Sequence, residues 1–220
     1  MTTDSQHTGG TLTLTGEGQV QAKPDIATIN LGVVTEARTA QEAVAQNAEL
    51  MTQVIARIKA LGIPAEDIQT AGFNISPIVD FQDDSPTFGK VVGYRVEDTL
   101  RVTVAVALTG KVLDEGIGAG ANVAGQLSFG LRDEKPFRHR AVQAAVKSAQ
   151  SDAEFLAHQM GATLRGTTSV ELLYGGSPVL VRGLRTAEKI GTPIEPGTLT
   201  ISASVRMVWK YEKAGGKSRG

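Results

Sequence analysis

The sequence predicts an α+β fold, in which mainly antiparallel sheets carry two long helices and one short helix on their apolar faces. Most predicted strands alternate strictly between apolar and polar residues, a pattern typical of sheets with one solvated face and of antiparallel pairing. Two long stretches instead place apolar residues at helical spacing, and each such helix needs a sheet face to cover its stripe. The composition, 41% hydrophobic and 20% charged, is that of a globular protein.

The chain opens with an expected strand–turn–strand unit. Residues 11–15 alternate as a half-buried strand, and the same period resumes at residues 29–33. Between them, the glycines that flank Glu17 are expected to form a turn or bulge, and the Pro24-Asp25 pair predicts a second turn.

The first long helix is expected over residues 40–61. Thr39 is its predicted N-cap, and Glu42, three residues later, completes a capping box. Gly62 supplies the left-handed residue that commonly ends a helix.

The remaining elements alternate between strands and helices, which we interpret as repeated βα units. Strands are expected at 68–79, 94–108, 127–131, 170–174 and 199–209, a short helix at 110–118 and a long helix at 136–160. The long helix is expected to bury Val142, Ala145, Val146, Ala149, Leu156 and Met160. An acidic, turn-rich connection spans residues 80–89, and an irregular stretch spans 175–197.

These elements predict a single domain over residues 11–211, with flexible tails at 1–10 and 212–220. No apolar run approaches the ~20 residues of a membrane-spanning helix. Residues 1–110 carry 7 basic and 13 acidic side chains, whereas residues 111–220 carry 15 and 10. This asymmetry is explained either by internal complementarity or by complementary faces on neighbouring subunits. The basic residues are not dense enough to predict a nucleic-acid partner.

No motif predicts an enzyme, a metal or a cofactor. Gly16-Glu17-Gly18 lacks the third glycine and the following helix of a dinucleotide site. His139 and His158 are separated by roughly 30 Å along one helix and cannot share a metal within the chain. The carboxylates of residues 80–84 lack the alternation of a calcium loop, and the chain contains no cysteine.

Besides the acidic connection at 80–89, two segments are candidates for contacts with a partner. The stretch 176–196 is apolar yet punctuated by glycine and proline, which is consistent with a loop folded on its own core, an arm that docks on a neighbouring subunit, or an arm that touches a membrane. Its candidate subunit-contact residues are Val179, Leu180, Val181, Arg182, Leu184 and Arg185. The basic cluster at 132–140 is the second segment, and it could form ion pairs with acidic groups on a partner.

A set of short motifs, in order, resembles the SIMPL family over residues 11–211. The motifs are Gly-Glu-Gly with Lys-Pro-Asp (16–25), the Ala/Glu-rich helix 40–60, 61–70, Gly-Tyr-Arg (93–95), Gly-Ala-Asn (120–122), Ser-Phe-Gly-Leu (128–131) and 192–197. The resemblance implies a bacterial α+β protein that forms ring-like or channel-like homo-oligomers and is linked to oxidative stress tolerance. It implies a periplasmic location if a signal peptide has been removed, and a cytoplasmic one otherwise. It brings no catalytic residues.

Our leading hypothesis is therefore a non-enzymatic, self-assembling protein with a structural or interaction role, in which the 176–196 arm and the acidic 80–89 connection lie at subunit contacts. The alternative is a module that binds a small ligand or metal at a site between subunits. An enzyme is the least favoured class.

Overall fold

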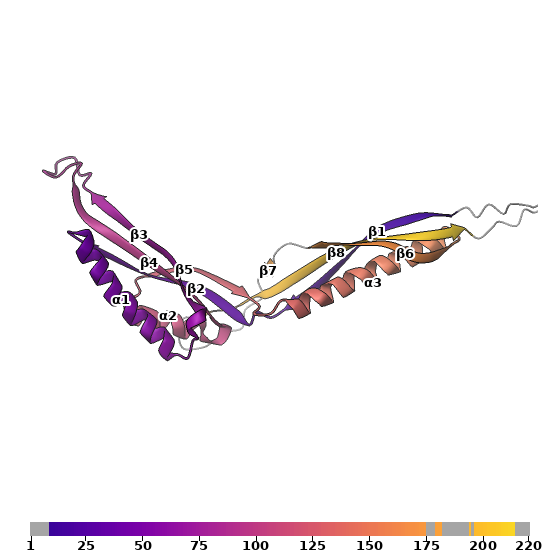
Figure 1. Ribbon diagram of the computed structural model, residues 1–220, viewed down its shortest axis with the longest axis horizontal. Coiled ribbons are helices and arrows are strands. Elements are labelled where there is room, and N and C mark those ends of the chain that lie inside the picture. The colour runs from indigo at the N-terminus through magenta and orange to yellow at the C-terminus, as the bar shows by residue number, and fades with distance from the viewer. Residues whose placement is uncertain (1–8, 175–178, 182–193, 195, 214–220) are drawn as a thin grey trace, which may run out of the picture. The chain divides into compact units, whose positions relative to one another are not determined.

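A computed structural model describes residues 9–174, 179–181, 194 and 196–213, and these divide into two compact units (Figure 1). Unit 1 holds the described residues of 9–23, 133–181 and 198–213, and unit 2 holds those of 24–132 and 194–197. Each unit contains its own sheet and its own helix cover. The single-domain description over 11–211 stays a prediction.

Unit 1 is a four-stranded antiparallel sheet under one helix. Its central strand is β8 (Thr198–Lys213), which pairs with β1 (Gly9–Ala22) on one side and with β6 (Ala162–Tyr174) and β7 (Val179–Val181) on the other. Helix α3 (Lys135–Gln159) packs mainly on β1 and β8. Strands β1 and β8 extend two residues beyond the expected domain at each end, and the other residues of both tails lie outside the described residues.

The last strand has the alternation that the sequence predicts. Six β8 side chains are buried toward α3, namely Leu199, Ile201, Ala203, Val205, Met207 and Trp209. The predicted stripe of α3 was only partly correct, because the fully buried positions are alanines spaced four apart: Ala141, Ala145, Ala149, Ala153 and Ala157. Val142, Val146 and Leu156 are half-buried, and Met160 is exposed.

The glycines at 16 and 18 explain this alanine stripe. They do not form the predicted turn or bulge, because both lie inside β1, paired with Val205 and Ala203 of β8. A Cβ atom on Gly16 would lie 2.1 Å from the backbone oxygen of Ala145, and one on Gly18 the same distance from that of Ala141. The helix backbone therefore rests directly on β1, at a depth that only glycine facing alanine permits.

Unit 2 has a second four-stranded antiparallel sheet, in the order β3-β4-β2-β5. The strands are β2 (Ile26–Ala37), β3 (Ile68–Val79), β4 (Val91–Ala105) and β5 (Val123–Gly130), accompanied by the helices α1 (Ala40–Ala60), α2 (Thr109–Gly118), η1 (Ala65–Asp67) and η2 (Val106–Leu108). Helix α1 packs on β2 and β4. The core alternates along these two strands and includes Ile29, Leu31, Val33, Leu100 and Val102.

The predicted ends of α1 are confirmed, whereas strand boundaries differ: β5 begins at Val123 and β6 at Ala162, earlier than the predicted residues 127 and 170. Thr39 accepts a hydrogen bond from the backbone N–H of Glu42 (3.2 Å), and Gly62 has φ +82°. The strand expected to reach residue 108 gives way to η2 at Val106. Residues 23–25 connect strands of different sheets, so β1 and β2 are not a hairpin.

The α+β class and the antiparallel pairing are confirmed, with three α-helices among the described residues. The βα-unit description stays an interpretation.

Candidate functional site

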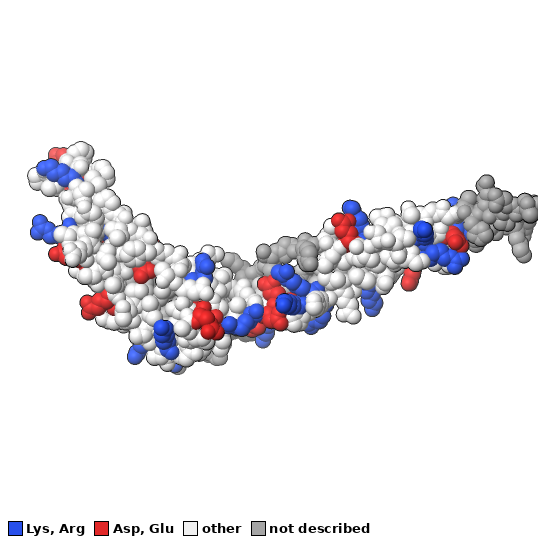
Figure 2. Space-filling view, in the orientation of Figure 1, with Lys and Arg blue, Asp and Glu red and all other residues white. Residues whose placement is uncertain are grey.

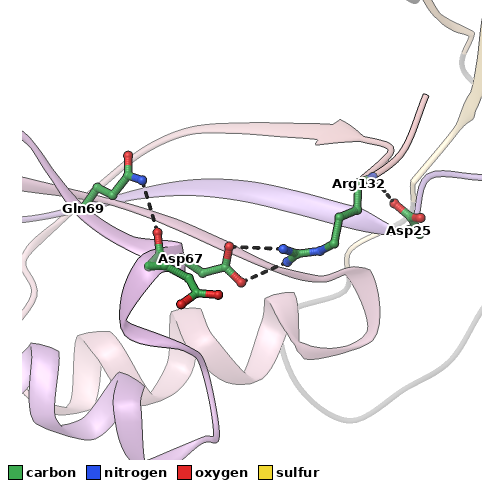
Figure 3. A network of polar contacts seen from close by, with 5 residues as sticks. Asp25, Asp67, Gln69 and Arg132 are labelled. Carbon is green, nitrogen blue, oxygen red and sulfur yellow. Dashed lines mark hydrogen bonds and ion pairs between the residues drawn. The ribbon is translucent and has the colours of Figure 1, made fainter. Parts of the chain in front are cut away.

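One charged network lies at one end of the unit 2 sheet, next to the first residues of β2 and β3 and the last residue of β5 (Figure 3). The guanidinium of Arg132 donates to both carboxylate oxygens of Asp67 (2.9 and 3.3 Å), and the backbone N–H of Arg132 donates to Asp25 Oδ1 (2.8 Å). The hydrogen bond to Asp67 and the charge of that carboxylate raise the pKa of Arg132. Asp25 belongs to the Lys-Pro-Asp motif, so this motif links the residue before β2 to the residues that follow β5.

Asn122, of the Gly-Ala-Asn motif, has a comparable structural role. Its Oδ1 accepts from the backbone N–H of Val34, and its Nδ2 donates to the Val34 oxygen, both at 2.7 Å. The side-chain amide thus completes the pairing of β2 beyond the first residue of β5. Together with Gly16, Gly18 and Asp25, it shows that these motif residues build the fold.

The described residues hold no group of three or more histidine and acidic side chains that could bind a metal. The connection at 80–89 is ordered around Asp80, whose Oδ1 accepts from the Gln82 N–H (3.0 Å). Asp80 Oδ2 accepts from the hydroxyls of Ser85 and Thr87. These bonds, led by the one from Ser85, lower the pKa of Asp80. Both oxygens of the Asp80 carboxylate therefore accept hydrogen bonds from residues of the same connection.

A pair of polar side chains lies within the apolar layer between α1 and the sheet. Asn47 of α1 donates to the backbone oxygens of Val33 (2.8 Å) and Val96 (3.4 Å). Asp98 pairs with Val33 in the ladder and lies on the same face of β4 as the buried Val96. Among the described residues, Asn47 Oδ1 and Asp98 Oδ1 are buried without a hydrogen-bond partner. Desolvation raises the pKa of Asp98, although a backbone hydrogen bond at Thr99 opposes this.

Replacing Asp98 by asparagine is expected to stabilise the protein by about 1 kcal/mol at pH 7 and by much less at pH 3. The folded-state pKa lies above the ordinary value of 3.8, so the folded protein favours the neutral carboxyl. Its contribution to stability is complete below pH 3.8 and is lost as the pH rises through the folded-state pKa. Urea unfolding followed by circular dichroism at both pH values measures the difference. An equal gain at pH 3 and pH 7 would contradict it.

The edge strand β3 presents an uncovered apolar strip. Phe73 and Ile75 pair with Asp98 and Val96 of β4, and therefore lie on the sheet face that α1 covers over β2 and β4. They are nevertheless 55% and 44% exposed, because α1 packs over the neighbouring strands. We call these two residues the β3 strip.

The connection between β3 and β4 continues this exposed surface. Phe81 and Phe88 are exposed by 75% and 53%, and Asp83 and Asp84 are exposed beside them. We call residues 81–88 the hairpin tip. It combines two aromatic rings with two carboxylates on a connection that Asp80 holds in place.

Unit 1 has a surface that is also partly apolar, but its charged side chains are basic. A cavity of about 470 Å³ lies between the first turns of α3 and strand β6, lined by Lys135, Arg138, His139, Val142, Gln143 and Leu172. Val170 and Leu172 lie on the face of β6 that turns toward α3, and both are exposed. We call this cavity the α3–β6 groove.

The charges of the groove are not balanced within it. Arg138 pairs with Glu134 at 2.7 Å, whereas no ion pair of Lys135 is found among the described residues. A second cavity, of about 520 Å³ between α1 and α2, differs because its Arg57 and Glu115 pair with each other at 2.7 Å.

On the face that Figure 2 shows, basic and acidic side chains are interspersed over both units. The totals nevertheless differ: the described residues of unit 2 carry 8 basic and 13 acidic side chains, and those of unit 1 carry 9 and 7. Unit 2 is therefore acidic and unit 1 weakly basic.

The predicted contact arm is only partly described. Val179, Leu180 and Val181 form β7, a short strand within the stretch expected to be irregular, and they pair with Thr200, Leu199 and Thr198. Arg182, Leu184 and Arg185 lie outside the described residues. The sequence predicts Phe73, Ile75 and Leu172 as apolar residues of strands but not as exposed contact residues, because an edge strand and a central strand have the same alternation.

The comparisons with known proteins agree with the motif pattern. The SIMPL family model, described as a protein of unknown function (DUF541), matches residues 12–209. The chain is 34% identical over 211 residues to the 26 kDa periplasmic immunogenic protein of Brucella melitensis, covering 91% of this chain and 84% of the relative. The Brucella abortus protein of the same name gives the same identity and coverage.

A further relative is the uncharacterized protein YggE of Escherichia coli K12, which is 31% identical over 153 residues, 68% of this chain and 60% of the relative. Among the described residues, no helix is long and apolar enough to cross a membrane. With a family match that spans nearly the whole chain, this protein belongs to the SIMPL family.

Proposed function

We propose that this chain is a non-enzymatic periplasmic protein that self-assembles and has a structural or interaction role in the bacterial envelope, linked to stress tolerance. The observation that carries the proposal is the β3 strip, where two large apolar side chains lie uncovered on an edge strand. Folded proteins usually cover or blunt such edges, and uncovered ones favour association.

A second copy of the chain is the partner that the charges favour. Unit 2 has a net charge of −5 over its described residues and unit 1 of +2, so unlike units of two copies attract each other. The periplasmic location is supported by the names of the Brucella relatives, which are called periplasmic. The non-enzymatic role is supported by the structural use of the motif residues Gly16, Asp25 and Asn122.

Replacing Phe73 and Ile75 together by serine is expected to lower the particle mass, because the substitutions remove the apolar strip. Light scattering on a size-exclusion column should give a multiple of 23.1 kDa for the unmodified protein and a smaller particle for the variant. Asn74→Asp is the control, since its side chain points to the opposite face of β3. A monomeric unmodified protein would contradict self-assembly. An unchanged mass for the double variant would contradict the role of the strip.

The contact arm of Val179–Val181 with Arg182, Leu184 and Arg185 remains a proposed subunit contact. Leu180→Asp with Leu184→Asp tests it in the same experiment, where an unchanged particle mass would remove the arm from the interface.

The alternative function is a module that binds a small ligand, and the α3–β6 groove favours it. Its volume of about 470 Å³ falls within the range of small-molecule sites. Native mass spectrometry of purified protein, with elemental analysis for metals, tests this alternative. A bound mass that is lost on Leu172→Ser would support it, and a clean apo mass would count against it.

A further inference from the structure

We infer that the hairpin tip of one copy docks in the α3–β6 groove of a second copy. The inference rests on the proposed self-assembly and assigns the two surfaces that meet. It begins from a match of chemistry, since the tip carries exposed aromatic rings and carboxylates, and the groove carries exposed apolar side chains and cations.

The groove needs an occupant that is both apolar and acidic. Val142 and Leu172 line it, and Val170 continues the apolar surface along β6. Lys135, Arg138 and His139 follow one another at helical spacing along the same wall. Because Glu134 balances only Arg138, a carboxylate brought to the groove gains the uncompensated charge of Lys135.

The hairpin tip has carboxylates and aromatic rings close together in the sequence, which complement the cations and apolar side chains of the groove. Asp83 and Asp84 lie between Phe81 and Phe88 in the sequence, and all four are exposed. The Asp80 network holds the connection in shape, with Gly89 N–H donating to Asp80 O (2.7 Å) and Thr87 Oγ1 to Asp80 Oδ2 (2.5 Å). A pre-ordered tip loses less conformational entropy on docking than a flexible one. Aromatic residues at the centre of an interface commonly carry most of its binding energy.

A contact of this kind is heterologous, because different surfaces of the two copies meet. Each copy then keeps one free tip or one free groove, so assembly continues until it closes into a ring or extends as a filament. An interface that joined two hairpin tips would instead bring together four carboxylates, which repel each other.

Charge reversal tests the pairing. The tip variant carries Asp83→Lys with Asp84→Lys, and the groove variant carries Lys135→Glu with Arg138→Glu. Each variant alone is expected to associate roughly 100-fold more weakly than the unmodified protein, because like charges face each other. The chain with all four substitutions is expected to regain the larger particle. Lys147→Glu with Lys210→Glu is the control, since it changes the net charge equally at exposed sites of unit 1 outside the groove.

Light scattering of the full-length chains measures the outcome. Assembly of the unmodified protein, loss in both double variants and recovery in the quadruple variant would support the inference. If the unmodified protein assembles and either double variant does so equally well, the surfaces are wrong and self-assembly stands. Failure of the quadruple variant to regain mass, with intact circular dichroism, would also overturn the pairing. A monomeric unmodified protein would overturn the proposed function itself.

Discussion

Replacing Gly16 by alanine is expected to destabilise unit 1 by about 3 kcal/mol, a large effect for one added methyl group. The new Cβ would lie 2.1 Å from the oxygen of Ala145 and 2.5 Å from the nitrogen of Ala149, both backbone atoms of α3. A side chain could rotate away from such an overlap, but a helix backbone can only move as a whole. Moving it would separate the alanine stripe from β1 along several turns.

The fluorescence of Trp209 provides the measurement. It is the only tryptophan of the chain, and it is buried in the core between α3 and β8. Urea unfolding followed at this residue should give a lower midpoint for Gly16→Ala than for the unmodified protein. Gly166→Ala is the matched control, because it lies in β6 of the same unit and a Cβ there would meet nothing within 4 Å. Equal midpoints for the two variants would show that close packing at Gly16 is not required.

This close approach marks a boundary of what the sequence predicts. The glycines at 16–18 predict a turn or bulge from the sequence alone, since glycine is commonest where the backbone bends. The signal for the correct reading lies more than a hundred residues away, in the four-residue spacing of the alanines of α3. Small residues on a helix and on a strand predict a contact only when the two are known to face each other.

The strands and helices themselves were largely predictable, because each has a period that one sequence reveals. The alternation of β8 predicted its buried face residue by residue, and Thr39 and Gly62 predicted the ends of α1. The division into two units was not predictable, because unit 1 combines segments from both ends of the chain, which leaves it near residue 23 and returns near residue 133.

The β3 strip and the α3–β6 groove could not be predicted from the sequence for a related reason. Phe73 and Ile75 alternate as a half-buried strand should, and alternation gives the face of a strand but not its neighbours. Only the strand order places them at an edge that α1 does not cover. The basic cluster of 132–140 is visible in the sequence, yet its members belong to different units: Arg132 joins the Asp67 network of unit 2, whereas Lys135 and Arg138 line the groove of unit 1.

Replacing Asn47 by aspartate is expected to destabilise unit 2 by about 3 kcal/mol or more at pH 7, although the two side chains have nearly the same shape. Asn47 is 1% exposed, and its Nδ2 group donates to the oxygens of Val33 and Val96. A carboxylate would place a negative oxygen against these two acceptors, next to a strand in which Asp98 already has a buried, unpartnered oxygen.

Hydrogen exchange of the β2 and β4 amides measures this loss, because their protection depends on the layer that Asn47 joins to the sheet. A loss of about 3 kcal/mol corresponds to a decrease in protection of roughly a hundredfold. Asn74→Asp is the matched control, since it makes the same substitution at an exposed position of β3. If Asn47→Asp and Asn74→Asp reduced protection equally, the buried amide would not be what holds α1 against the sheet.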